Sequence, residues 1–205
     1  MKVLLVNASP RKEGNTALAL QEMRRVFEKN GIGVEYLFIG NQAIRGCMAC
    51  GGCAKKGACV FDDAVNTAAP LFMEADGFVI GSPVYYASAN ATAIAFMDRL
   101  FYSTSLDKRM KVGAAVAVAR RGGCSATFDE LNKYFTICGM PVASSQYWNS
   151  VHGRLAGEAA GDAEGLQTVR VLAENMSFLM KSIALGKAQF GLPEAEPHIM
   201  TNFIR

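Results

Sequence analysis

The sequence of 205 residues has little net charge and no long apolar run. Its 21 basic and 18 acidic residues leave a net charge of +3, too small to indicate nucleic acid or an anionic membrane as a partner. The N-terminal apolar run ends at Val6, far short of a signal peptide, and no stretch is long enough to cross a bilayer. We therefore expect a cytoplasmic protein with no nucleic-acid or membrane partner.

The sequence also lacks the dinucleotide fingerprint G-x-G-x-x-G at any turn from strand to helix, which disfavours a Rossmann nicotinamide domain. Five short apolar runs alternate instead with amphipathic helices, as in a doubly wound parallel sheet. The predicted strands cover residues 3–6, 34–39, 77–81, 112–119 and 141–145. We predict a flavodoxin-like α/β fold with strand order 2-1-3-4-5 and helices on both faces, in which the loops after strands 1, 3 and 4 converge at the switch point.

The loop after the first strand is dense in hydrogen-bond donors. It contains Ser9 and Arg11, and we expect Asn15 to cap a helix that begins at Thr16. Because the first turn of a helix has unpaired N–H groups and a positive dipole, this loop suits a phosphate monoester. The alternative is a turn whose serine and asparagine merely cap the helix.

Two further loops carry groups suited to an aromatic ligand. In the loop 82–88, Pro83 stiffens the backbone and two tyrosines offer flat faces to a ring system. In the loop after the fourth strand, two arginines precede Gly122 and Gly123, whose backbone N–H groups can approach a ligand closely. The alternatives are a structural turn with surface tyrosines and a tight turn with solvated arginines.

The first two loops carry a family resemblance. Ser9-Pro10-Arg11 with Gly14-Asn15-Thr16, followed by Gly81-Ser82-Pro83-Val84-Tyr85, resembles the NADPH-dependent FMN reductase group of flavodoxin-like proteins, over most of the chain to about Gly153. The resemblance implies that the first motif binds the FMN phosphate and the second the isoalloxazine, with a less specific match in the third loop. The implied FMN-binding residues are Ser9, Arg11, Asn15, Thr16, Pro83, Val84, Tyr85, Tyr86, Arg120, Gly122 and Gly123.

Four of the six cysteines lie within thirteen residues, as Cys47-x2-Cys50-x2-Cys53-x5-Cys59. Four thiolates this close can ligate a single [4Fe–4S] cluster, and the spacing resembles the compact motif of iron–sulfur flavoproteins, a branch of the same group. Three alternatives remain open. They are a structural zinc site, a redox dithiol formed by Cys47 and Cys50, and cysteines that only pack.

These features favour an FMN-dependent oxidoreductase that takes a hydride from NAD(P)H and passes electrons to an acceptor. The second interpretation is an iron–sulfur flavoprotein that carries electrons to a protein partner, and the third is a scaffold without cofactor. Three residues near the expected flavin have open roles. Cys124 follows the third loop within reach of the ring, Trp148 either shields a flavin or anchors packing, and His152 either relays protons or lies at the surface.

We expect one domain over residues 1–188, with the cysteine-rich loop 46–60 inserted, and a C-terminal tail over 189–205. Two prolines prevent a helix in the tail, yet it keeps several apolar residues. These are Leu192, Ile199, Met200, Phe203 and Ile204. Because exposed apolar patches usually mark contacts, we expect a homodimer or tetramer in which the tail or the Trp148 loop reaches another subunit. The alternative is a tail that packs on its own domain.

Overall fold

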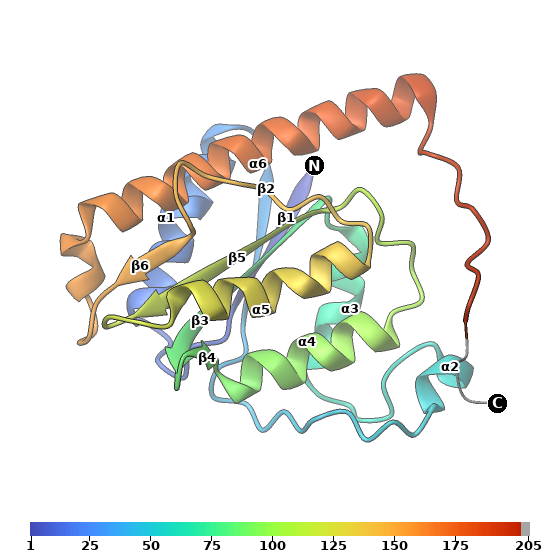
Figure 1. Ribbon diagram of the computed structural model, residues 1–205, viewed down its shortest axis with the longest axis horizontal. Coiled ribbons are helices and arrows are strands. Elements are labelled where there is room, and N and C mark those ends of the chain that lie inside the picture. Colours follow the sequence, from blue (N-terminus) through green and yellow to red (C-terminus); the bar gives the residue numbers. More distant parts are fainter. Residues whose placement is uncertain (202–205) are drawn as a thin grey trace.

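The computed structural model describes residues 1–201, in which helices cover both faces of one sheet (Figure 1). The strands are β1 (Lys2–Asn7), β2 (Gly33–Phe38), β3 (Gly77–Tyr85), β4 (Ser88–Ala89), β5 (Val112–Ala119) and β6 (Ser150–His152). The helices are α1 (Asn15–Lys29), α2 (Gly52–Lys56), α3 (Ala64–Glu74), α4 (Ala91–Ser103), α5 (Cys124–Ile137), the 3₁₀ turn η1 (Glu158–Gly161) and α6 (Ala163–Phe190). Among the described residues, no helix combines the length and apolar character needed to span a membrane.

The sheet order is β2-β1-β3-β5-β6, all parallel, with the two-residue β4 pairing antiparallel to the end of β3. Without β4 this is the predicted order 2-1-3-4-5, so the flavodoxin-like fold is confirmed. Strands β1, β3 and β5 lie side by side, and the chain leaves each of them at the same edge of the sheet. The three loops of interest therefore start close together.

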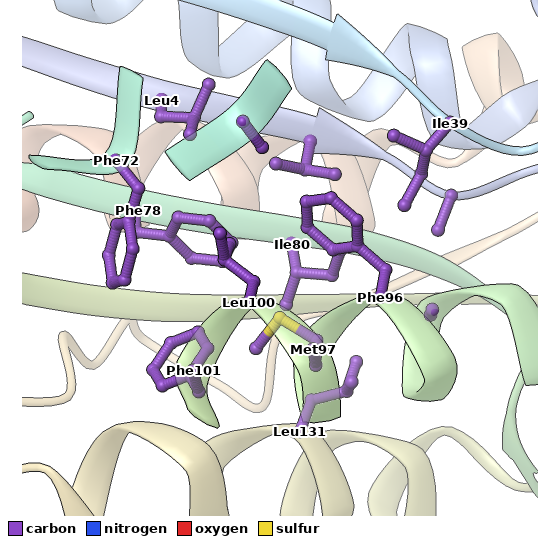
Figure 2. Packing of buried hydrophobic residues seen from close by; sticks show 14 of the residues in the cluster. Leu4, Ile39, Phe72, Phe78, Ile80, Phe96, Met97, Leu100, Phe101 and Leu131 are labelled. Atoms are coloured by element: carbon purple, nitrogen blue, oxygen red, sulfur yellow. The ribbon is translucent and has the colours of Figure 1, made fainter. Parts of the chain in front are cut away.

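Alternating strand residues build a separate apolar layer on each face. Leu4 and Val6 of β1 pack with α3, α4 and α5, where aromatic side chains dominate (Figure 2). Val3 and Leu5 face the other way and pack with α1 and α6. This period of two, with apolar residues on both sides, is what a parallel strand covered by helices requires.

The predicted fifth strand is wrong. Residues 141–145 form only an isolated bridge, Gly113 to Val142, at the start of β5. The edge strand is β6, whose residues Ser150–His152 pair with the end of β5 at residues 117–119. Sequence pattern could not separate these segments, because an edge strand of three residues in a polar loop carries no apolar periodicity.

The third strand is longer than predicted, since it continues through Ser82 and Pro83 to Tyr85. Strand β1 pairs with β3 only as far as Gly81, so beyond that point β3 has lost one neighbour. Proline is tolerated where a strand has such a free side, because no ladder hydrogen bond is lost there.

Helix α6 runs to Phe190, two residues past Ala188, where the sequence predicts the end of the domain. Residues 191–201 then continue without regular structure down one side of the molecule (Figure 1). Ile199 and Met200 are each 83% exposed, while Arg109 donates a hydrogen bond to the Pro193 carbonyl oxygen at 3.2 Å. The described tail is thus tied near its start and presents apolar side chains near its end. Phe203 and Ile204 lie outside the described residues.

Candidate functional site

The loop from β1 to α1 closes tightly around its own polar groups. Asn7 Oδ1 accepts a hydrogen bond from the Ser9 N–H at 3.0 Å, and Ser9 Oγ accepts one from the Arg11 N–H at 3.2 Å. Gly14 is the N-cap of α1 and offers no side chain to the first-turn N–H groups. Those N–H groups and the positive end of the helix dipole therefore remain available to an anion.

The prediction that Asn15 caps helix α1 is wrong, because the helix begins at Asn15 itself. Its side-chain amide instead joins the distant segment 153–159 to this loop. Asn15 Nδ2 donates to the Leu155 carbonyl oxygen at 2.9 Å, and Asn15 Oδ1 accepts from the Ala159 N–H at 3.2 Å. A Cβ on Gly153 would lie 2.6 Å from Asn15 Nδ2, so this approach requires glycine. With its side chain engaged, Asn15 has its backbone N–H left for a ligand.

The second loop is a two-residue turn between β3 and β4. Its central residues, Tyr86 and Ala87, have φ angles of 51° and 60°, which L side chains adopt at a cost. The third loop packs directly against it, since a Cβ on Gly123 would lie 2.8 Å from both Val84 Cγ1 and Ala87 Cα. Backbone contact thus fixes the two loops relative to each other.

A cavity of about 200 Å³ lies where the loops meet. It brings together eight of the eleven predicted FMN-binding residues, namely Ser9, Arg11, Asn15, Thr16, Pro83, Val84, Tyr85 and Arg120. Sequence analysis missed Gly153 and Arg154, which also line it. In the sequence, a glycine in a polar loop was the only indication that these two residues belong to the site. With three arginines and no acidic side chain among its described lining residues, the cavity suits an anionic ligand.

The other three predicted residues lie around this cavity. Gly122 and Gly123 line a neighbouring cavity of about 260 Å³. Tyr86 is fully exposed at the tip of its turn, beside an open groove along α4. The cavity of about 200 Å³ and its rim thus draw on all three loops, so different loops are available to a phosphate and to a ring system.

Cys124 and His152 both line the neighbouring cavity, and the Asp162 carboxylate lies beside the His152 ring. Cys124 Sγ lies 3.9 Å from His152 Nε2, and His152 Nδ1 lies 3.4 Å from Asp162 Oδ2. Asp162 is held by the backbone N–H groups of His152 and Gly165, at 2.6 and 3.0 Å. Burial, reinforced by the Asp162 charge, raises the pKa of the Cys124 thiol, so this group favours its protonated form.

The cysteine-rich loop places its four predicted ligands at different depths. All four predicted ligands line one small cavity of about 20 Å³, but Cys47 and Cys50 are exposed, Cys53 is half-buried and Cys59 is buried. Within residues 1–201, no three His, Cys, Asp or Glu side chains are arranged to hold a metal ion. As a donor set, the four thiols that line this cavity suit an iron–sulfur cluster or zinc.

Arg99 joins this loop to helix α4, and sequence analysis did not identify it. Its side chain is 1% exposed and pairs with Asp63 through two hydrogen bonds of 2.6 and 3.0 Å. Its Nε and Nη2 atoms also donate to Cys59 Sγ at 3.3 and 3.1 Å. Burial alone lowers the pKa of Arg99, but the bonds to Asp63 and Cys59 outweigh it and leave that pKa raised.

Comparison with known proteins agrees with this geometry. Residues 1–155 match the family model of the NADPH-dependent FMN reductases. An iron–sulfur flavoprotein of Methanocaldococcus jannaschii is 32% identical over 191 residues, which span 89% of this chain and 99% of that protein. One of Methanosarcina thermophila is 30% identical over 188 residues, spanning 89% and 97%.

Solved structures agree in fold. RosB with a bound intermediate, 8-demethyl-8-formylriboflavin-5′-phosphate, matches with a TM-score of 0.71 at 16% identity, over 100% of this chain and 92% of that one. A flavodoxin from the domain Archaea matches with a TM-score of 0.59 at 17% identity, over 88% and 99%. The chain belongs to the NADPH-dependent FMN reductase family of flavodoxin-like, FMN-binding flavoproteins, in the group that contains the iron–sulfur flavoproteins.

Proposed function

We propose that this flavin oxidoreductase binds FMN in the cavity between the three loops, takes a hydride from NAD(P)H and passes electrons to an acceptor. The observation that carries the proposal is the convergence of the donor-rich first loop with Pro83, Val84 and Tyr85 around one cavity. When bound, FMN would supply the redox chemistry, and the protein would supply position and electrostatics.

The residues of the cavity have distinct roles in this proposal. Arg11 donates one N–H to the Arg154 carbonyl oxygen at 3.1 Å and has further guanidinium N–H groups for a phosphate. Ser9 and the first-turn N–H groups of α1 would complete the phosphate site. Tyr85 and Tyr86, 47% and 106% exposed, would lie beside the isoalloxazine. No residue is assigned to proton transfer.

Anaerobic titration tests the hydride donor. Addition of NADPH or NADH to the purified FMN complex should bleach the visible flavin band within seconds, and admission of air should restore it. A flavin band that neither nucleotide bleaches would contradict the NAD(P)H step and leave FMN binding intact.

We also propose that Cys47, Cys50, Cys53 and Cys59 hold a [4Fe–4S] cluster. The support is the presence of all four thiols around one cavity, together with the name of the relatives, iron–sulfur flavoprotein. A cluster would exchange single electrons, which FMN can combine into pairs. The visible spectrum of anaerobically purified protein should contain a broad shoulder under the flavin bands. Sharp flavin bands alone would contradict the cluster.

The second candidate function is electron transfer to a protein partner, favoured by the exposure of Cys47 and Cys50 at the surface. An electron carrier would need the cluster within reach of a partner and little NAD(P)H activity of its own. Slow flavin bleaching by NAD(P)H, combined with rapid reduction by a reduced low-potential electron-transfer protein, would favour the carrier over the NAD(P)H reductase.

We further propose a homodimer or tetramer, supported by apolar side chains that the tail and α6 leave exposed, such as Phe190 and Ile199. Light scattering should give at least twice the mass of one chain. A monomer would contradict the proposal. A truncated chain that ends at Ala188 tells two contact surfaces apart. If the tail makes the contact, the truncated protein should dissociate; if the Trp148 loop makes it, the oligomer should remain unchanged.

A further inference from the structure

Arg99 is the largest fully buried side chain in the described protein, and it carries a full positive charge. Arginine is almost never buried completely unless it is paired. Helix α4 carries Arg99 between apolar neighbours, yet the guanidinium leaves the apolar layer and ends in the cysteine-rich loop. Such a costly placement requires compensation from the groups around it.

Two side chains accept hydrogen bonds from opposite edges of this guanidinium. Asp63 accepts bonds from Nη1 and Nη2, and Cys59 Sγ accepts bonds from Nε and Nη2. The remaining bonds go to the Arg45 and Phe61 carbonyl oxygens, at 3.3 and 3.4 Å. The Asp63 carboxylate balances the charge of Arg99. The Cys59 sulfur is the other side-chain acceptor of the guanidinium.

The sulfur contact separates Cys59 from the other cysteines of the loop. Sulfur in a thiol is a weak acceptor, whereas a metal-bound thiolate carries negative charge and accepts well. Cys59 is buried and held at two N–H groups, while Cys47 and Cys50 are exposed. Protein contacts of its own therefore position the Cys59 sulfur.

We propose that Arg99 is a positioning residue of the metal centre, which anchors the Cys59 sulfur and raises the reduction potential of the cluster. The inference rests on the proposed cluster. A positive donor at a ligand sulfur stabilises the reduced cluster more than the oxidised one, because reduction adds negative charge. Partners of metal ligands also hold the metal, so their loss weakens metal affinity about 10-fold or more.

The test compares Arg99→Gln and Arg99→Lys with a matched control, Arg45→Gln. Arg45 lies over the same Phe61 ring, with Cζ 4.7 Å from the centroid against 5.2 Å for Arg99. The Arg45 side chain is exposed, and its contribution to Arg99 comes from its backbone oxygen, which the substitution keeps. Two properties are measured on anaerobically purified protein, the rate of iron loss to a chelator and the cluster midpoint potential by EPR-monitored titration.

Arg99→Gln should lose iron about 10-fold faster than the wild type and shift the midpoint potential to more negative values. Arg99→Lys keeps the positive charge but loses the planar guanidinium that reaches both Asp63 and Cys59. Its rate of iron loss and its midpoint potential should therefore lie between those of the wild type and Arg99→Gln. Arg45→Gln should match the wild type in both measurements. An unchanged potential in Arg99→Gln would overturn the inference, because a merely structural arginine would not set the potential.

Asp63→Asn keeps the test decisive if the Arg99 variants do not fold. It retains a side-chain oxygen, which the Val65 N–H needs at the start of α3, but removes the charge that balances Arg99. The uncompensated guanidinium should then shift the potential to more positive values, opposite to Arg99→Gln. A wild-type protein without iron would overturn the cluster and this role together. Iron in the wild type with no shift in Asp63→Asn or Arg99→Gln would overturn this role alone.

Discussion

The proposed FMN cavity and the cysteine-rich loop differ in how many of their residues buried contacts hold in place. In the cavity, Asn15 links the first loop to residues 155 and 159, and Gly123 packs against the turn at residues 86 and 87. In the cysteine-rich loop, the bonds from Arg99 fix Cys59, while Cys47 and Cys50 remain exposed. The first site is built from backbone and buried amides, and the second has one anchored ligand.

Folding alone therefore supplies a different share of each site. A preorganised cavity requires little rearrangement when its ligand binds, and this increases affinity. In the proposed cluster site, a bound metal would tie the exposed cysteines to Cys59, so metal binding and ordering of the loop would be coupled. Removal of the metal should disorder the cysteine-rich loop and leave the FMN cavity unchanged.

We expect the strongest effect from breaking the buried ion pair that anchors the cysteine-rich loop at Cys59. Asp63→Ala leaves Arg99 buried without its carboxylate partner, which should lower the free energy of unfolding by about 3–5 kcal/mol. Asp62→Ala, at an exposed neighbouring carboxylate, should change it by less than about 0.5 kcal/mol. Urea unfolding of metal-free protein measures both, and equal stabilities would show that the pair anchors nothing.

A substitution in the proposed FMN cavity, away from the cysteine-rich loop, should have the next largest effect. Arg11→Ala should weaken FMN binding by about 1.5–3 kcal/mol, since it removes a charge-assisted bond to the phosphate. Lys12→Ala is the control, a cation in the same loop that does not line the cavity. Isothermal titration calorimetry measures both affinities. Unchanged affinity in Arg11→Ala would remove the phosphate assignment.

Timed alkylation should rank the cysteines by their surroundings in metal-free protein. Exposed Cys47 and Cys50 should react first, and buried Cys59 last. Burial raises the pKa of both Cys124 and Cys138, so near neutral pH fewer of these thiols are thiolates, and they should react at least about 10-fold more slowly than Cys47. Mass spectrometry follows each site. Rapid alkylation of Cys59 would contradict its anchored position.

We expect the weakest effect from backbone strain in the turn between β3 and β4, beside the proposed FMN cavity. Ala87 has φ of 60°, a conformation that glycine adopts without cost, so Ala87→Gly should stabilise the protein by about 0.5–1 kcal/mol. Thermal unfolding measures the change. A lower melting temperature would mean that the Ala87 methyl group, which contacts the third loop, matters more than the strain.

The sequence predicted the strand order and most of the cavity because both depend on local pattern. Apolar runs identified β1, β2, β3 and β5, and turn residues identified the loops that follow them. The edge strand β6 was missed because its three residues pair with β5 through backbone alone. Gly153 and Arg154 were missed with it, since they follow β6 directly.

Long-range side-chain contacts explain the other differences. Asn15 fits the pattern of an N-cap, and only the distant Leu155 and Ala159 give its amide another partner. Arg99 resembles a solvent-facing charge on an amphipathic helix, and its acceptors lie 36 and 40 residues away in the sequence. Local periodicity contains no information about such pairs.

We propose that one chain carries two separately built centres, one for FMN and one for iron. The FMN and iron content of anaerobically purified wild type and Cys50→Ala tests this proposal. We expect about four irons per chain with FMN in the wild type, and no iron with unchanged FMN in Cys50→Ala. Wild-type protein that contains no iron, or zinc in its place, would contradict the account, as would a Cys50→Ala protein that loses FMN together with iron.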